Sequence, residues 1–469
     1  MTRRRHAQLT IAEVILFGLA VKPEDLMDTV LRNIDRALDD EQLVDKVVEV
    51  MRRRHPNSAR RGRNSTPAEV VLRMLVLRHL RGWSYDALER EVRGSLVYRQ
   101  FCRIGAGKAP DAKTLIKLGK LVDGSALREL FERVTQLAAP ACSSGQKMRV
   151  DTTVLDAPIH HPTDSSLCED SVRVLSRLMR RIAGVGVKLS FHFRNVRLSV
   201  SRRIREIATA ARLRGDKAKA AMNKPYRGLI RVAGRLTRQA AIALVDAREQ
   251  FDKLGPADQD KLAHLTAQLE AMLPRTRQIV KQTGARILRG VTDSPGKIVS
   301  IFEPWAQIIR KGKIHKPTEF GAVIKVQESE GGLVTDITVA ESTADQILLI
   351  PSIQRHIELF GRPPQLVSTD RGFFSAKGEK QAKELGVRSL VLPKPGHRTA
   401  ERIEHEQRRS FRRGRAWRAG GEGRISYLKR SFGMNRSRYK GPTSAARTAL
   451  WAGIAHNLTV ASRSKRMQR

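Results

Sequence analysis

The sequence predicts an α/β protein in which a mixed β-sheet follows a helical N-terminal region and is interrupted by a helical insertion. Two short strand-like segments carry an acid each, Asp151 within residues 148–155 and Asp370 at the end of residues 364–370. The long stretch 165–290 between them has helical periodicity instead. After it, strand-like and helical segments alternate, which is typical of a sheet with crossover helices.

Composition points to a globular protein with a polyanionic partner. The 469 residues include 88 Lys and Arg against 47 Asp and Glu, a net charge of +41, and 41% of the residues are hydrophobic. This length allows two to four domains with real cores, and the hydrophobic content excludes a largely disordered chain. Ribosomal, membrane-surface and heparin-binding proteins are alternatives. Nucleic acid is the usual partner for a large protein with such an excess.

Cysteine usage and hydropathy predict a cytoplasmic protein without a membrane partner. Cys102, Cys142 and Cys168 form no CxxC pair, which argues against a zinc site or a disulfide framework and suits a reducing cytosol. No window approaches the ~20 apolar residues of a membrane span. The apolar run 11–21 contains Glu13 and lacks a small-residue cleavage site.

The N-terminal region is predicted to be helical, first over residues 22–55, followed by a basic linker to residue 65. Further helix starts are expected at a Thr66–Glu69 capping box, Ser84, Asp111 and Ser125. Short helices joined by Gly-containing turns are similar to a helix-turn-helix arrangement, and an ordinary helical bundle fits the pattern equally well. The charge favours DNA contact, with residues 111–121 as the first candidate for a recognition helix.

Asp151 is the first candidate site residue. The segment around it alternates and is β-branched, so it should be a strand, and Asp156, an odd number of residues away, should face the opposite side. His160, His161 and Asp164 follow closely. A solvated loop is favoured over a metal site there, because the spacing fits no standard ligand set.

The insertion is strongly basic. Between Arg177 and Arg238 the chain has eighteen Lys and Arg and two acids. A solvated helical face is the alternative, but this ratio exceeds what solubility needs. We expect a surface that binds phosphates in a salt-sensitive, largely sequence-independent way, with Arg202, Arg203 and Arg205 as DNA contacts. Residues 257–289 should pack back as an antiparallel helix.

The sheet is predicted to resume after the insertion. Expected elements are an extended segment at 298–301, a hairpin of strands 321–327 and 333–339 around Gly331-Gly332, a helix from a capping box at 342–345 to about 360 kinked at Pro351, the strand 364–370, a helix at 376–385 and a strand at 387–392. A basic helical segment follows. Asp370, at the exit of a buried strand, is either a turn residue or a site residue.

A motif in the last segment identifies a family. Arg418, Glu422 and Lys429 have the spacing R-x3-E-x6-K. Together with the element order, this resembles the RNase H-like fold of the DDE transposases of bacterial insertion sequences. The usual tyrosine of that motif falls at Arg415, with Trp417 the nearest aromatic residue. The N-terminal helices also resemble those of the family, and the similarity is weakest over 165–290.

The resemblance implies a metal-dependent active site. Asp151, Asp370 and Glu422 would be the catalytic and metal-binding acids, holding Mg²⁺ or Mn²⁺, two ions in all. Arg418 and Lys429 would position DNA ends, with Arg430 near the same phosphates. Competing third acids are Glu401, Glu404 and Glu406, but the motif spacing favours Glu422. Asp336 and Asp345 are better explained as a strand-face residue and a helix cap.

The expected protein is a transposase that binds terminal inverted repeats, cleaves at element ends and joins them to target DNA. It would be nucleoid-associated and oligomeric on double-stranded DNA. Alternatives are an RNase H-like nuclease without strand transfer and an inactive or domesticated DNA-binding protein. The expected domains are an N-terminal segment 1–62, a helical DNA-binding domain 63–140, a catalytic domain 146–165 and 291–440, the insertion 166–290 and a C-terminal helix and tail 441–469.

Overall fold

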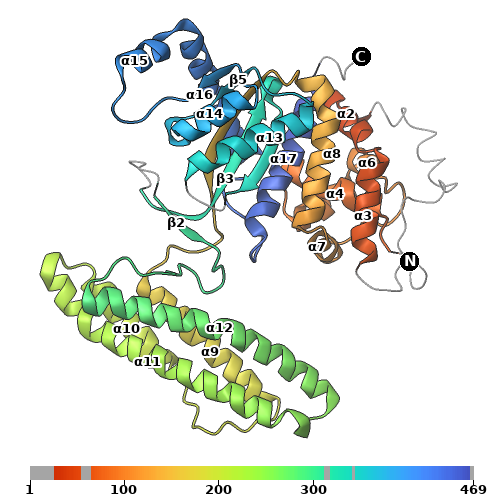
Figure 1. Cartoon of the computed structure of the whole chain (residues 1–469). Coiled ribbons are helices and arrows are strands. Elements are labelled where there is room, and N and C mark those ends of the chain that lie inside the picture. The colour runs from red at the N-terminus through yellow and green to blue at the C-terminus, as the bar shows by residue number, and fades with distance from the viewer. Residues whose placement is uncertain (1–25, 54–64, 311–316, 341–343, 465–469) are drawn as a thin grey trace. The chain divides into compact units, whose positions relative to one another are not determined.

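A computed structural model describes residues 26–53, 65–310, 317–340 and 344–464 of the chain (Figure 1). The chain forms two compact units. We call the first, Met1–Ala157 with Gly321–Arg469, the sheet unit, and the second, Pro158–Phe320, the helical unit. The sheet unit therefore consists of two stretches of chain that are far apart in sequence.

A mixed β-sheet forms the centre of the sheet unit. Its described strands are β1 (Lys147–Asp156), β3 (Glu319–Ser329), β4 (Val334–Val339), β5 (Leu366–Ser368) and β6 (Ser389–Val391). β3 runs antiparallel to both β1 and β4, while β5 is parallel to β1 and β6 is parallel to β5. The order is β4-β3-β1-β5-β6, so β1 is the strand where the antiparallel and parallel parts meet.

The two faces of the central strands carry different side chains, as expected from strand alternation. Met148 and Val150 of β1 and Val367 of β5 are buried in a core cluster with residues of α13 (Leu349–Phe360). Full burial of each such aliphatic side chain contributes roughly 1.5–3 kcal/mol. The intervening residues of β1 face the other way, toward α16 (Arg409–Ser431).

The predicted hairpin is confirmed. Gly331 and Gly332 in η3 (Glu330–Gly332) have φ of 73° and 82°, which favours glycine. A Cβ at Gly331 would lie 1.8 Å from the carbonyl oxygen of Cys142, so no other residue fits without movement. Glu330 accepts hydrogen bonds from the amides of Gln146 and Lys147 at 2.8 Å each. The hairpin thereby fixes the start of β1.

Helices from both ends of the chain complete the sheet unit. The N-terminal ones are α2 (Thr29–Ala37), α3 (Glu41–Arg52), α4 (Ala68–Arg81), α5 (Tyr85–Gly94), α6 (Leu96–Phe101), α7 (Ala112–Leu121) and α8 (Gly124–Cys142). α17 (Ser444–Ser462) packs against α2, α4, α8 and β4 and is buried along most of its length. Asn457 of α17 bonds both the amide and the carbonyl of Val334 at the start of β4. The C-terminal helix thus joins the N-terminal helices to the sheet.

The predicted N-terminal helices are confirmed, with corrections at their starts. Ser84 and Asp111 cap α5 and α7 as expected. The capping box at 66–69 is wrong: the N-cap of α4 is Pro67, whose side chain cannot form a hydrogen bond, and Glu69 is paired with Arg73. Asp123, rather than Ser125, caps α8.

The helix expected over 22–55 is two helices, capped by Asp28 and Asp40. Two parts of that prediction, residues 22–25 and most of the basic linker (54–64), lie outside the described residues.

The helical unit confirms the predicted helical stretch. Its long helices are α9 (Asp164–Gly184), α10 (Arg197–Ala210), α11 (Gly215–Glu249) and α12 (Pro256–Arg289), joined in part by η2 (Phe251–Lys253). They enclose an apolar core rich in Leu, Val and Ala, and α12 packs along α11 as predicted. Figure 1 shows α9, α11 and α12 as long rods side by side.

Two predictions between the insertion and Asp370 are wrong. Residues 298–301 form no strand, because the Gln282 side chain bonds both the amide and the carbonyl of Ile298 in place of a partner strand. A short strand, β2 (Gln307–Ile309), follows instead. Pro351 does not kink a helix: η4 (Asp345–Leu348) precedes α13, and Pro351 lies in the first turn of α13, where its missing N–H is tolerated.

The remaining elements are η5 (Arg371–Phe373), α14 (Ala376–Glu384) and α15 (Ala400–Gln407). α14 and β6 fall where a helix and a strand were predicted. None of the helices in the described ranges is long and apolar enough to span a membrane.

Candidate active site

α16 lies across the sheet face that carries Asp151. The Ser368 hydroxyl of β5 donates to the carbonyl of Gly414 at 3.1 Å, and Arg149 of β1 donates to the carbonyl of Trp417. A Cβ at Gly414 would lie 2.6 Å from Val391, and one at Gly420 would lie 2.8 Å from Arg149. Glycine at these two positions therefore allows α16 to approach the sheet closely.

The parallel register brings Asp151 and Asp370 to corresponding positions. Arg149 pairs with Ser368, and each acid comes two residues later on its own chain segment. By strand alternation, each acid should share the face of the residue two positions before it, which is the face that α16 covers. The Asp370 carboxylate accepts a hydrogen bond from the Gly372 amide at 2.9 Å and caps η5. The turn interpretation and the site interpretation of Asp370 are thus compatible.

Arg418 joins the first and third predicted acids. One terminal guanidinium nitrogen lies 3.4 Å from Asp151 Oδ2 and the other lies 3.4 Å from Glu422 Oε1. The Asp151 and Arg418 side chains are about a fifth exposed, whereas Glu422 is 71% exposed. Partly exposed pairs at this distance contribute at most about 1 kcal/mol. These side chains can therefore rearrange at little cost.

A buried charge network, formed by Glu328 and two arginines, lies next to the site. Glu328 of β3 is paired with Arg149 at 2.8 Å and with Arg424 of α16 at 3.1 Å, and its side chain is only 3% exposed. Arg149 also lies 4.7 Å from the centre of the Trp417 ring. The sequence interpretation missed this network. One signal was available, because Arg149 is two residues before Asp151 and must share its face of the strand.

The two other cations of the motif region are placed differently. Lys429 is half-buried, and its ammonium group donates to the Val154 carbonyl of β1 at 2.8 Å, so it anchors α16 to the central strand. Arg430 is exposed. The predicted contacts of both with phosphates stay predictions.

The competing acids have structural roles of their own. Glu406 accepts from the Lys394 amide at 3.0 Å and pairs with Arg402 and Arg398. Burial raises its pKa, but these hydrogen bonds outweigh burial and hold the pKa below its usual value. Glu404 pairs with Arg408, and Glu401 is exposed in the first turn of α15.

Asp336 is a strand-face residue, as predicted. It is buried and forms ion pairs of 2.7 Å with both Lys325 and Arg128. Burial raises the pKa of Asp336, but the two cations more than offset it and leave the pKa below its usual value.

Asp345 is not the helix cap that was predicted. Ala344 is the N-cap of η4, without a side-chain bond, and Asp345 Oδ1 accepts a hydrogen bond from the Thr152 hydroxyl at 3.0 Å. A Cβ placed on Gly372 would lie 3.1 Å from Asp345 Oδ2 and 3.2 Å from Asp370 Oδ1. A further carboxylate therefore lies beside Asp370, and the local capping pattern concealed it.

The basic residues predicted for the insertion also differ among themselves. Arg202 and Arg205 are exposed, and Arg202 is 3.6 Å from Glu206. Arg203 instead donates to the Ser199 carbonyl at 2.8 Å and lies against Gly228 of α11. His160 and His161, in the loop before α9, are exposed. Asp164, the first residue of α9, is buried and paired with Arg286 at 2.9 Å.

The implied metal fits the donor chemistry of the three acids but not their present arrangement. Carboxylate oxygens are the ligands that Mg²⁺ prefers. Within the described ranges, however, no three His, Cys, Asp or Glu side chains are close enough to hold one metal ion. The guanidinium group of Arg418 lies between Asp151 and Glu422, so this position favours positive charge. A metal site would require Arg418 and the exposed Glu422 to move.

Comparison with known families gives one match. Residues 21–121 match the family model described as "Transposase domain (DUF772)", about a fifth of the chain. No curated protein and no solved structure matched the chain significantly. The chain thus contains a transposase domain, and such a domain indicates contact with DNA.

Proposed function

We propose that this protein is a DNA transposase whose sheet unit contains a DDE active site formed by Asp151, Asp370 and Glu422. The transposase domain at 21–121 supports the general activity. The observation that carries the catalytic assignment is the position of α16, where Arg418 contacts both Asp151 and Glu422 while β5 leads to Asp370 at the matching register of β1. Asp151 and Glu422 thus contact the same guanidinium group, and Asp370 follows the strand next to β1.

The strand order supports an RNase H-like catalytic domain. On one side of β1, β3 and then β4 continue the sheet as antiparallel strands. On the other side, β5 and then β6 continue it as parallel strands. This is the early hairpin followed by crossover helices on which the family resemblance was based. In the sequence, the helical unit is inserted between β1 and β3.

Asp151, Asp370 and Glu422 would hold two Mg²⁺ or Mn²⁺ ions, which would supply the charge neutralisation that phosphodiester cleavage needs. Asp151 would be positioned by the central strand and Asp370 by its bond to the Gly372 amide, while the exposed Glu422 of α16 would move to complete the site. Arg418 is suited to neutralise a phosphate, because a guanidinium donates to two phosphate oxygens at once. Lys429 would keep α16 on β1 through Val154.

The substrate would be double-stranded DNA, both the terminal inverted repeats of an element and the target. The net charge of +41 supports a polyanionic partner of this kind. Because the two ends of an element must be brought together before both are joined to one target, we propose a homo-oligomer on DNA. A protein with this activity would work at the nucleoid.

Substitution of Asp370 tests the catalytic assignment. Asp370→Asn keeps the shape of the side chain and removes its charge, so Mg²⁺-dependent end cleavage should fall by about a thousandfold or more, the equivalent of several kcal/mol of lost transition-state stabilisation. Cleavage is measured on duplexes from the flanks of the coding DNA. Binding of the same duplexes in EDTA should be nearly unchanged.

Glu404→Gln is the matched control, since it also removes one carboxylate near the motif but from an exposed pair with Arg408. It should cleave normally. Full cleavage by Asp370→Asn would exclude the proposed active site.

Arg418 between Asp151 and Glu422 also favours a second candidate, a DNA-binding protein without catalysis. Wild-type protein that binds the ends but never cleaves them in Mg²⁺ or Mn²⁺ would support it. Cleavage without joining of the ends to a second duplex would indicate a nuclease instead.

A further inference from the structure

The longest basic helix of the helical unit has a regular stripe of cations. In α11 the residues concerned recur at intervals of three, four or seven: Lys217, Lys224, Arg227, Arg231, Arg235 and Arg238. With 3.6 residues per turn, these intervals place all six on one side of the helix. All six are exposed. We call this set the α11 stripe.

The α11 stripe is on the side of the helix that faces away from the core. Leu229, Ala233, Leu236 and Ala240 of the same helix are buried in the core of the helical unit. The sequence has no acid between Asp216 and Asp246, so the stripe is not interrupted by negative charge. Core packing therefore explains one side of α11 and leaves the basic side unexplained.

Ion pairing separates the stripe from other cations of the helical unit. Arg248 pairs with Glu270 at 2.6 Å, Lys261 with Asp258 at 2.7 Å, and Lys219, next to the stripe, with Asp216 at 3.3 Å. Among the residues that the structure describes, no acid pairs with a member of the α11 stripe. The repulsion among these six charges is thus not relieved within the described protein.

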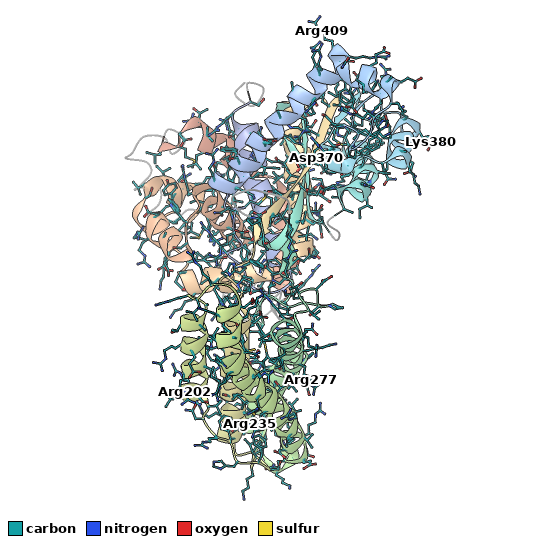
Figure 2. All side chains as sticks on the ribbon, turned by 90° about the vertical axis from the view of Figure 1, so that its left-hand side faces the viewer. Arg202, Arg235, Arg277, Asp370, Lys380 and Arg409 are labelled. Atoms are coloured by element: carbon teal, nitrogen blue, oxygen red, sulfur yellow. The ribbon has the colours of Figure 1, made fainter. Side chains whose placement is uncertain are left out.

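The neighbouring helices extend the basic surface. On one side, Arg203 of α10 lies against Gly228. On the other, Val280 of α12 lies 3.8 Å from the Cβ position of Gly234. Next to these contacts, Arg202 of α10 and Arg277 and Lys281 of α12 are exposed. Figure 2 shows Arg202, Arg235 and Arg277, which belong to α10, α11 and α12.

We infer that the α11 stripe binds the phosphate backbone of double-stranded DNA. The inference rests on the proposed function for the choice of DNA as the polyanion. From residue 217 to residue 238 the helix extends about 32 Å at 1.5 Å per residue, close to one turn of B-DNA at ~34 Å. A row of charges of this length along one side of a helix suits a stiff duplex.

A membrane surface fits this face less well. Helices that lie on bilayers insert a large apolar side into the lipid. The exposed large apolar residues of α11 are Ile242 and Val245, both beyond the last cation of the stripe, and Leu213 lies before the helix. Within α11 the stripe therefore has no large exposed apolar residue between its first and last cations, and contact with phosphates would be electrostatic and independent of base sequence.

The salt dependence of DNA binding tests this inference. Each phosphate contact contributes about 0.9 to the slope of log K against log salt. In the full-length protein, the triple variant Lys224→Gln, Arg231→Gln and Arg235→Gln should reduce the magnitude of this negative slope by about three. Binding is measured on a mixed-sequence 30-base-pair duplex in EDTA. The charge-matched control is Arg248→Gln, Lys253→Gln and Lys261→Gln, which should change the slope by less than one.

Equal slopes for the two triple variants would overturn the inference. Selective loss of binding to an RNA hairpin, or to vesicles with anionic lipid, with duplex DNA binding unchanged would also overturn it and would identify the other partner. All six substituted residues are exposed, and a thermal melt by circular dichroism checks that both variants are folded.

The outcome is separable from that of the proposed active site. Asp370→Asn should abolish cleavage and leave the salt dependence of DNA binding unchanged. The triple variant of the α11 stripe should instead have a weaker salt dependence of DNA binding. A slope difference in a protein that never cleaves DNA would leave the stripe established and the active site refuted.

Discussion

The sheet unit and the helical unit use the same residue, arginine, in opposite ways. In the sheet unit, Arg149 and Arg424 share the buried Glu328, and Arg73, fully buried, pairs with Asp35 and Glu69. In the helical unit, the arginines of α11 lie on the outside of an apolar core. In these examples, buried charge in the sheet unit holds distant segments together, whereas the charge on the outside of α11 is available to a partner. A residue count alone cannot separate the two uses.

The largest expected effect comes from breaking the buried network. Glu328→Gln leaves Arg149 and Arg424 without a counter-charge, so the free energy of unfolding should fall by about 3–5 kcal/mol. Urea titration followed by circular dichroism measures it. Glu270→Gln in the helical unit removes the partner of the exposed Arg248 and should cost less than about 1 kcal/mol. Similar losses in both variants would contradict the comparison.

Acid should destabilise the sheet unit before the helical unit. Burial lowers the pKa of His456 to about 3 and also lowers that of His356, and both side chains are fully buried. The unfolded chain takes up these protons below about pH 6.5, so stability is complete above that pH and is lost as pH falls. His456 alone should cost about 2 kcal/mol at pH 5.

The described histidines of the helical unit, His160, His161, His192 and His264, are all exposed. Hydrogen exchange with mass spectrometry, corrected for intrinsic rates, should thus show lost protection between pH 7 and pH 5 in α17 and β4 but not in α11 and α12. His456→Gln can still donate to the Gly332 carbonyl and should weaken this pH dependence. Uniform loss of protection across both units would refute the assignment.

The smallest expected effect separates two adjacent arginines. Arg203 packs against Gly228 and bonds the Ser199 carbonyl, so Arg203→Ala should lower the stability by about 1 kcal/mol through lost packing and a lost hydrogen bond. Arg202 is exposed, and Arg202→Ala should change stability by less than about 0.5 kcal/mol. Thermal melts give both values. DNA affinity at low salt should fall more for Arg202→Ala, and the reverse order would show that Arg203 is the contact.

Local signals in the sequence were sufficient for most elements. Asp111 and Ser84 cap their helices because capping depends only on the next three residues, and the glycines at 331 and 332 form the hairpin because few other residues adopt positive φ. These features are readable because each is determined within a short window.

Several of the errors and omissions involve contacts between residues that are separated in sequence. Gln282 replaces a strand partner for Ile298, which removed a predicted strand. Asp345 bonds Thr152, 193 positions earlier, rather than capping its own helix. Arg149 and Glu328 are 179 positions apart. No local pattern contains such pairs, because they depend on where the fold brings separate segments together.

The most direct test of the central claim, that three acids of the sheet unit form one metal site, is anomalous diffraction from crystals soaked in Mn²⁺. We predict Mn²⁺ peaks bounded by Asp151, Asp370 and Glu422, with the Arg418 guanidinium group moved out from between the first and the third. Mn²⁺ bound elsewhere, with Arg418 still in contact with Asp151 and Glu422, would contradict the account.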